Sequence, residues 1–229
     1  MIDWHSHILP SLDDGSKSVN ESISMLKLLS GQGISKVIAT PHFYANDETV
    51  DNFIERRNSS YNVLTAEIND LPEIICGAEV RYYQGIGRME KIEKLCIGES
   101  NLLLLEMPFC KWTEYTVSEL LELSRSNAVN IILAHVERYM QFQKDSVLPM
   151  LYENGILFQV NANAFSEFST KRKVIKMLKN GLVHFIGSDC HDLKNRPPNI
   201  GSAYSIISKK LGNAFLEELI SFGDSMLDN

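Results

Sequence analysis

Seven short apolar runs, each separated from the next by a segment of helical patterning, constrain the fold of this chain more than any other feature. The first run opens the chain, and the others lie at residues 36–40, 74–79, 102–105, 130–134, 157–160 and 183–187. Because the runs are continuously apolar, both faces of each strand should be buried, which indicates a parallel sheet covered by helices. A first helix should begin at Ser18 or Asn20 and end near Gly31. Further helices are expected at residues 48–68, 89–95, 117–126, 147–153, 173–179, 202–211 and 214–222.

The residues at the ends of these runs distinguish between the two folds that share the pattern. An open doubly wound sheet concentrates its site at one switch point, whereas a closed barrel gathers all its strand ends around one mouth. Nearly every run here has a His, Asp or Glu at its C-terminal end. We therefore predict an α/β fold, a distorted seven-stranded (βα) TIM-like barrel. Because no linker or internal repeat interrupts the pattern, residues 1–229 should form a single domain.

These strand-end residues form a candidate metal site. His5 and His7, two residues apart on one strand, should point the same way, and Asp13 or Asp14 follows after a short loop. The candidate ligands are His5, His7, Asp14, His42, Glu79, Glu106, His135, Asp189 and His191. A single histidine at a strand end is usually just hydrogen-bonded. Five histidines and four carboxylates at one mouth, however, would be too costly to desolvate unless cations compensated them.

The ligand types indicate which ions would bind and what chemistry they would support. Mixed imidazole and carboxylate ligands without thiolate suit Zn, Mn or Fe, and the set is large enough for two or three divalent ions. Two ions about 3.5–4 Å apart commonly serve phosphoester hydrolysis, because they bind phosphoryl oxygens and bring the pKa of bound water toward ~7. Arg138 and Arg196, on loops at the same mouth, are suited to bind phosphoryl oxygens bidentately.

Charge and composition exclude several other classes of protein. A net charge of −7 argues against nonspecific nucleic-acid binding, although a metal cluster would still admit an anionic substrate. No apolar run approaches the roughly 18 residues of a membrane helix, and the start of the chain lacks the pattern of a secretory signal. The four cysteines are scattered, as is typical of free thiols in a reducing compartment. We therefore expect a cytoplasmic protein without membrane insertion, and the sequence leaves its oligomeric state open.

Several motifs, in order along residues 1 to about 205, resemble those of a known family. They are His5-Ser6-His7, Asp13-Asp14-Gly15, Thr40-Pro41-His42, Gly77-Ala78-Glu79, Leu105-Glu106, Ala134-His135-Val136-Glu137-Arg138-Tyr139, Ser188-Asp189-Cys190-His191 and Asn195-Arg196-Pro197-Pro198. They resemble the PHP (polymerase and histidinol phosphatase) superfamily and, within it, the bacterial capsule and exopolysaccharide protein-tyrosine phosphatases. The resemblance implies a PHP-type barrel, up to three Mn, Fe or Zn ions and hydrolysis of phosphotyrosine. The implied substrate is the tyrosine-rich tail of a cognate autokinase that controls polysaccharide export.

The resemblance also implies a role for each candidate residue. The implied ligand groups are His5, His7, Glu79 and Asp189 for one ion, Glu79, Glu106 and His135 for a second, and Asp14, His42 and His191 for a third. The family pattern favours Asp14 over Asp13. Arg138 and Arg196 would stabilise the transition state. Phe43, Tyr44 or Trp112 would supply an apolar wall for the substrate ring.

The same residues admit other interpretations. A small-molecule phosphatase of the superfamily, such as a histidinol-phosphate phosphatase, would share the ligands, but the Arg-Pro-Pro and His-Val-Glu-Arg-Tyr blocks favour the protein phosphatase. A non-catalytic metal-binding partner module should have lost ligands. Cys190 and Arg196 have the C-x5-R spacing of cysteine-dependent phosphatases, but the loop between them has no glycine to cradle phosphate. The basic run 171–179 is interpreted as the solvated face of a helix in preference to a docking patch for an acidic phosphorylated tail.

Overall fold

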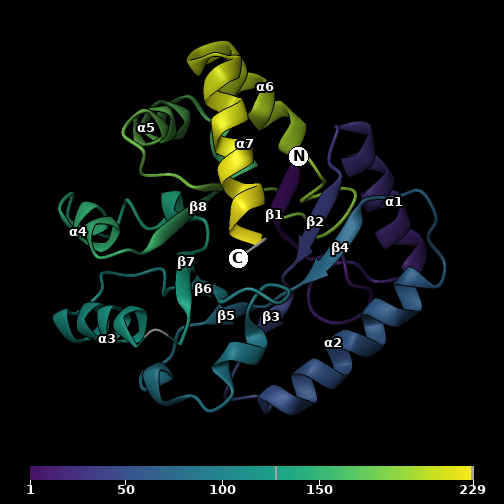
Figure 1. Ribbon diagram of the computed structural model, residues 1–229, viewed down its shortest axis with the longest axis horizontal. Helices are drawn as coiled ribbons and strands as arrows, with labels where there is room; N and C mark the ends of the chain where they lie inside the picture. The colour runs from purple at the N-terminus through teal and green to yellow at the C-terminus, as the bar shows by residue number, and fades with distance from the viewer. Residues whose placement is uncertain (127, 228–229) are drawn as a thin grey trace.

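The computed structural model describes residues 1–126 and 128–227, and its strands run parallel around a curled surface (Figure 1). The strands are β1 (Ile2–Ser6), β2 (Lys36–Ala39), β3 (His42–Phe43), β4 (Glu73–Cys76), β5 (Glu79–Arg81), β6 (Leu102–Glu106), β7 (Asn130–Leu133), β8 (Leu157–Asn161) and β9 (Phe185–Gly187). They form one sheet in the order β1-β2-β4 and another in the order β3-β5-β6-β7-β8-β9. Main-chain hydrogen bonds from His7 N to Cys190 O (2.9 Å) and from Asp189 N to His5 O (2.7 Å) link the end of β1 to the segment after β9.

The predicted count of seven strands is not confirmed, because a further strand, β3, follows the predicted run 36–40, and the predicted run 74–79 is divided into β4 and β5. Pro41, which has no N–H to donate to a strand ladder, separates β2 from β3. Gly77 separates β4 from β5, at a point where a Cβ atom would lie 2.9 Å from Ile97 Cγ1. Before these breaks β2 pairs with β4, and after them β3 pairs with β5, which continues the other sheet. The breaks therefore let two consecutive runs contribute to both sheets.

Helices surround the strands, with α1 and α2 on one side and α3, α4 and α5 on the other (Figure 1). Their bounds are α1 (Val19–Gly31), α2 (Val50–Thr65), α3 (Glu114–Arg125), α4 (Val147–Glu153), α5 (Phe168–Lys179), α6 (Ile200–Leu211) and α7 (Asn213–Leu227). The predicted cap is confirmed, because Ser18 Oγ accepts a hydrogen bond from Glu21 N. The helix predicted at 89–95 is shorter than expected and is a 3₁₀ helix, η2 (Ile92–Leu95); another 3₁₀ helix, η1 (Ile86–Arg88), ends just before the predicted range. No helix among the described residues is long and apolar enough to cross a membrane.

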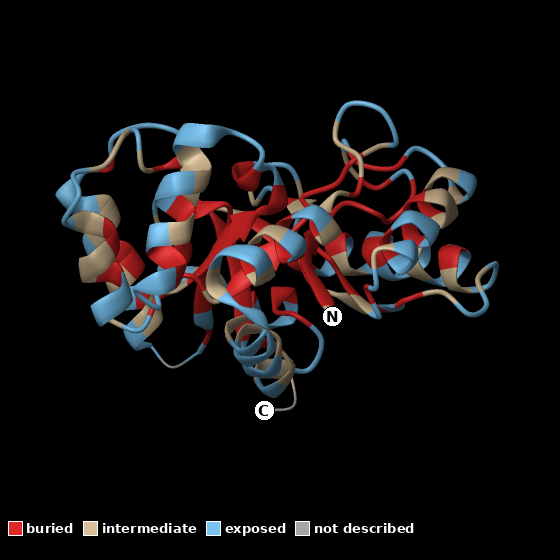
Figure 2. Ribbon diagram, turned by 90° about the horizontal axis from the view of Figure 1, so that it is seen from above, coloured by how far each residue is buried: buried red, intermediate tan, exposed pale blue. Residues whose placement is uncertain are grey.

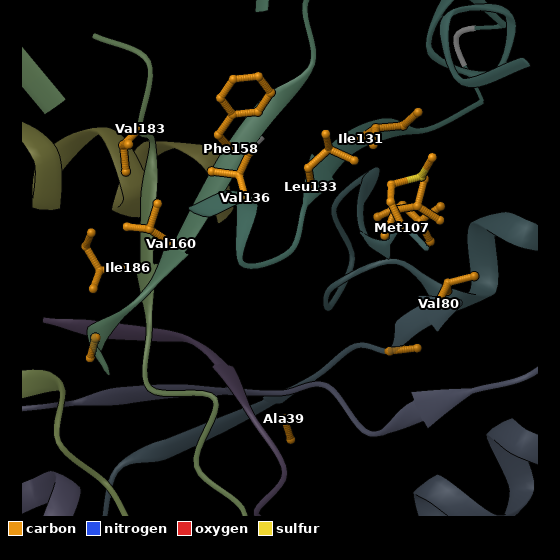
Figure 3. Close-up of a cluster of buried hydrophobic side chains, with 14 of the residues drawn as sticks. Ala39, Val80, Met107, Ile131, Leu133, Val136, Phe158, Val160, Val183 and Ile186 are labelled. Atoms are coloured by element: carbon orange, nitrogen blue, oxygen red, sulfur yellow. The ribbon is translucent and has the colours of Figure 1, made fainter. Parts of the chain in front are cut away.

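Two apolar clusters pack against the strands and leave one end of them polar. Buried residues gather on the central strands, whereas the outer faces of the helices are exposed (Figure 2). The larger cluster includes Leu133, Phe158 and Val160 from the neighbouring strands β7 and β8 (Figure 3). The smaller cluster includes Leu102 and Leu104, which share a face of β6 with Glu106. The face of β6 that contributes Leu102 and Leu104 to the apolar interior therefore ends in Glu106, a candidate ligand.

Candidate metal centre

The carboxyl ends of the strands bring all nine candidate ligands into one cluster. Each of β1, β3, β5 and β6 carries at least one of them, and the loops after β1, β7 and β9 carry the rest. Successive side chains of β1 point to opposite faces. Ser6 therefore points away from the cluster and donates to Ile38 O at 2.8 Å, while His5 faces His7. His135 and Asp189 adopt positive φ angles of 33° and 53°, a backbone region that is uncommon outside glycine, and this places their side chains at the cluster.

The first group of side chains has the spacing expected around a single ion. His5 Nε2 lies 3.2 Å from His7 Nε2, 3.4 Å from Glu79 Oε2 and 3.6 Å from Asp189 Oδ1. Ligand atoms at about 2.0–2.2 Å from a shared ion lie roughly 3–3.6 Å from one another in tetrahedral or octahedral geometry. All four side chains are almost completely buried. The two imidazoles and two carboxylates therefore converge on one point.

Glu79 connects this first group to a second. Its Oε2 faces His5 and His7, while its Oε1 lies 2.9 Å from His135 Nε2. The same His135 nitrogen lies 3.5 Å from Glu106 Oε1. A carboxylate that presents its two oxygens to separate sets of donors has the geometry of a bridging ligand.

The third group is the open side of the cluster. Asp14 Oδ1 lies 3.5 Å from His42 Nε2 and 3.3 Å from His191 Nε2. The Asp14 side chain is 62% exposed, whereas His191 is buried. His42 also approaches Glu79, with 3.0 Å between Nδ1 and Oε2, so it faces Asp14 with one ring nitrogen and Glu79 with the other.

Asp13, the competitor for the role of Asp14, has other partners. Its Oδ2 accepts hydrogen bonds from His7 Nδ1 at 2.7 Å and from His42 N at 2.9 Å, and its Oδ1 accepts one from Gly15 N. Burial opposes ionisation of Asp13, but the charge of His7 and these hydrogen bonds lower its pKa below the usual value. Asp13 therefore orients His7 from behind, and Asp14 is the aspartate that reaches the cluster.

The electrostatics of the cluster call for positive charge. Burial opposes a charged His7, but the neighbouring carboxylates of Asp13 and Glu79 raise its pKa to about 10. Burial likewise opposes a charged Glu79, but the charge of His5 and hydrogen bonds from histidines lower its pKa. Protonated imidazoles thus stand where cations would otherwise neutralise the carboxylates. The donor set fits divalent ions, whose binding would release these protons.

Three arginines line the mouth, of which the sequence predicted two. Arg138 Nη2 and Arg196 Nη2 donate to the same Asp189 oxygen, Oδ2, at 2.7 and 2.5 Å. Arg81 was not predicted; it forms an ion pair with Glu106. The signal for Arg81 was present in the sequence, since a residue two positions after Glu79 on a strand faces the same way.

β8 contributes no candidate ligand but holds two buried amides that the sequence analysis missed. Gln159 Oε1 accepts hydrogen bonds from His135 N at 2.7 Å and from His5 Nδ1 at 3.3 Å. Gln159 Nε2 donates to Asn161 Oδ1 at 2.9 Å, and Asn161 Nδ2 donates to Asp189 Oδ2 at 2.6 Å. This amide relay, Gln159 and Asn161, holds candidate ligands from three other segments in place. It requires Gly187, whose Cβ would lie 2.7 Å from Gln159 Nε2.

Of the three aromatic residues predicted as an apolar wall, only Tyr44 is exposed. Phe43 and Trp112 belong to the apolar core. Because both are buried, they cannot line an open mouth. Tyr44 and Phe109 are each 40% exposed. Their rings lie beside candidate ligands, Tyr44 at 5.4 Å from His42 and Phe109 at 5.6 Å from His135 between ring centroids.

The thiol of Cys190 is placed where it cannot act as a nucleophile. It is fully buried, and burial raises its pKa well above the ordinary value for a thiol. Catalytic cysteines need the opposite, a lowered pKa and access to substrate. The C-x5-R spacing is therefore not a cysteine-phosphatase site.

Comparisons with known proteins match almost the whole chain to one family. Residues 1–226 match the family described as capsular polysaccharide synthesis, CpsB/CapC. The chain is 32% identical to the tyrosine-protein phosphatase CpsB of Streptococcus pneumoniae, over 96% of this chain and 94% of the relative. It is 28% identical to the tyrosine-protein phosphatase YwqE of Bacillus subtilis, over 100% and 92%. A crystal structure from a study of YwqE and CpsB, described there as unique metal-dependent tyrosine phosphatases, superimposes with a TM-score of 0.86 at 26% identity and covers 100% of this chain and 95% of that one.

Proposed function

Since the chain belongs to the CpsB/CapC family of capsular polysaccharide synthesis, we propose that it is a metal-dependent protein-tyrosine phosphatase. The observation that carries this proposal is the convergence of nine imidazole and carboxylate side chains beneath a rim of arginines. Buried carboxylates fit divalent cations, and exposed guanidinium groups fit the oxygens of a phosphoryl group.

We propose that the protein holds two or three divalent ions, of Mn, Fe or Zn, in a single domain over residues 1–229. The proposed ligands are His5, His7, Asp14, His42, Glu79, Glu106, His135, Asp189 and His191, with Glu79 as the bridge between two ions. Distances within the three groups support this division. When bound, such ions supply Lewis acidity for the phosphoryl group and lower the pKa of water. No protein nucleophile is required, which agrees with the buried thiol of Cys190.

Arg138 and Arg196 are the proposed transition-state residues. Both are fixed by Asp189, so their guanidinium groups are held at the mouth before substrate arrives. Arg196 Nη1 also donates to His191 Nε2 at 2.7 Å. About one third of each side chain is exposed, 37% for Arg138 and 33% for Arg196, so phosphoryl oxygens can reach their exposed N–H groups. Preorganised donors of this kind stabilise the charge that develops during phosphoryl transfer. Arg81, bound to Glu106, extends the same positive rim.

Substrate recognition requires an apolar surface beside these charges. Tyr44 and Phe109 supply exposed rings next to His42 and His135, at a distance that suits the ring of phosphotyrosine. We propose that the natural substrate is the phosphorylated tail of a cytoplasmic tyrosine autokinase that controls capsule or exopolysaccharide synthesis. The family match and the names of the relatives support this assignment.

The test is to measure metal content and substrate preference on the same preparation. Protein purified without added metal should contain two or three equivalents of divalent ion and should hydrolyse a phosphotyrosine peptide, and chelation should abolish that activity. A strong preference for histidinol phosphate would instead assign a small-molecule phosphatase. Bound metal with no phosphoesterase activity would assign a non-catalytic partner module.

A further inference from the structure

A groove leaves the mouth beside Arg138 and runs along η3 (Val136–Arg138), α4 and α5. It consists of two neighbouring cavities of about 350 and about 360 Å³, and Met140 and Lys173 line both. Arg138 lines the inner cavity and also binds Asp189 in the candidate metal centre. A chain bound with one residue at the metal centre could therefore continue into this groove.

The outer cavity combines an apolar floor with a basic rim. Its apolar lining includes Met140, Leu148, Met177 and Leu182. Its rim carries Lys144, Lys173 and Lys176 against a single acid, Asp145. None of the three lysine side chains forms an ion pair with another residue of ranges 1–126 and 128–227. On a chain with a net charge of −7, unpaired lysines around one cavity form a local positive field.

The structure divides the basic run on α5 into two faces. Lys173 and Lys176 line the groove together with Met177, one turn apart on the helix. Arg172 and Lys179 are also exposed but do not line either cavity. A solvated face, the interpretation favoured from the sequence alone, describes only the second pair. The first pair borders an apolar hollow next to the inner cavity, which Arg138 of the candidate active site lines.

We propose that the outer cavity is a docking site for an acidic segment of the substrate protein, on one side of the phosphotyrosine that enters the metal centre. The inference rests on the proposed function, since it assigns a second contact to the same substrate. The lysines pair with carboxylates or further phosphate groups of that segment, and the apolar floor covers its hydrophobic side chains. Glu167 borders the inner cavity, so the anionic groups are expected in the outer one.

The experiment compares two double charge reversals on the same helix. The test variant is Lys173→Glu/Lys176→Glu, and the matched control is Arg172→Glu/Lys179→Glu, which changes the net charge of the protein equally. Each is assayed with p-nitrophenyl phosphate and with phosphotyrosine peptides that carry glutamates before the phosphotyrosine, after it, or on neither side. Binding of the same peptides with a non-hydrolysable difluorophosphonate in place of phosphotyrosine is measured by fluorescence anisotropy.

The test variant should lose on the order of tenfold in kcat/KM for one acidic peptide and keep its activity on p-nitrophenyl phosphate, which also shows that it is folded. The control should keep both activities to within about twofold. Equal losses in the two variants would show a general effect of net charge and overturn the proposal, as would an unchanged preference for the acidic peptide. If the parent hydrolyses neither substrate, the proposed function fails. The anisotropy measurement then tests docking in the groove independently of hydrolysis. Loss of acidic-peptide binding in the test variant but not in the control supports docking, and any other result refutes it.

Discussion

Replacing Gln159 with methionine should separate the orientation of the ligands from the stability of the fold. In the parent, Gln159 Nε2 donates to Asn161 Oδ1, and Asn161 Nδ2 in turn donates to the carboxylate of Asp189. Because Gln159 Oε1 is then an acceptor, His5 must carry a proton on Nδ1. When metal binding releases the second proton of His5, the Nε2 lone pair is the one that faces the cluster.

Gln159→Met keeps the size of the side chain but removes all three of its hydrogen bonds. The buried N–H of His135 loses its acceptor, at a cost of about 1–3 kcal/mol of stability. His5 loses the partner that fixes its tautomer, and loss of such a partner typically lowers metal affinity ~10- to 100-fold. Activity should therefore require more added metal, while kcat at saturating metal should recover most of the parent value.

The matched control is Val160→Ala, on the next residue of the same strand. Val160 is fully buried in the apolar layer between strands and helices (Figure 3). Its truncation should cost about 1–3 kcal/mol and leave the metal affinity unchanged. The affinities are measured by titrating metal-stripped protein in a calorimeter, and the stabilities by urea unfolding. Parental affinity in Gln159→Met, or an equal loss of affinity in Val160→Ala, would refute a positioning role for the amide.

Four further predictions concern single residues. Arg138→Ala should lower kcat at least ~100-fold if Arg138 acts in the transition state, whereas a raised KM at unchanged kcat would restrict it to substrate binding. His135→Ala or Glu106→Ala should abolish turnover without unfolding the protein, as circular dichroism would show, and an active variant would contradict the ligand assignment. Thiol alkylation should leave activity intact, because Cys190 is fully buried. His184, whose pKa burial lowers to about 4, should destabilise the parent progressively as the pH falls from about 6.5 to 4, by up to about 3 kcal/mol, and the difference in unfolding free energy between the parent and His184→Gln, measured with urea, should follow this slope.

The positions of the candidate ligands could be predicted because they depend on one rule, that parallel strands of a curled sheet direct their carboxyl ends to one mouth. That rule tolerates errors in strand boundaries. It placed His42 at the same mouth even though the run 36–40 ends before Pro41 and His42 lies in a separate strand, β3. The nature of the breaks could also have been inferred, since proline and glycine inside apolar runs signal an interruption. The effect of these breaks on the order of strands in the sheets could not have been inferred, because it depends on which strands β3 and β5 pair with after the breaks.

The aromatic wall illustrates a different limit. Phe43 and Tyr44 are adjacent, so on a strand they face opposite ways, and the sequence alone does not show which of the two faces the mouth. Packing decides: the ring of Phe43 lies 5.2 Å from that of Phe53 on α2, between centroids, which leaves Tyr44 outside. Phe109 is exposed because it follows β6 in a loop whose direction no periodic pattern predicts.

The amide relay shows why a search for ligands misses residues on which ligands depend. Gln159 lies inside an apolar run and cannot bind a divalent ion as strongly as a carboxylate, so a search by residue type passes over it. Its burial was nevertheless a signal, because a buried amide is costly unless partners satisfy it. Its partners here are His5 and His135 from two other segments and, through Asn161, Asp189 from a third. A strand without ligands can therefore determine how the surrounding ligands are held, and a polar residue in an otherwise apolar strand at a metal centre should be examined for that role.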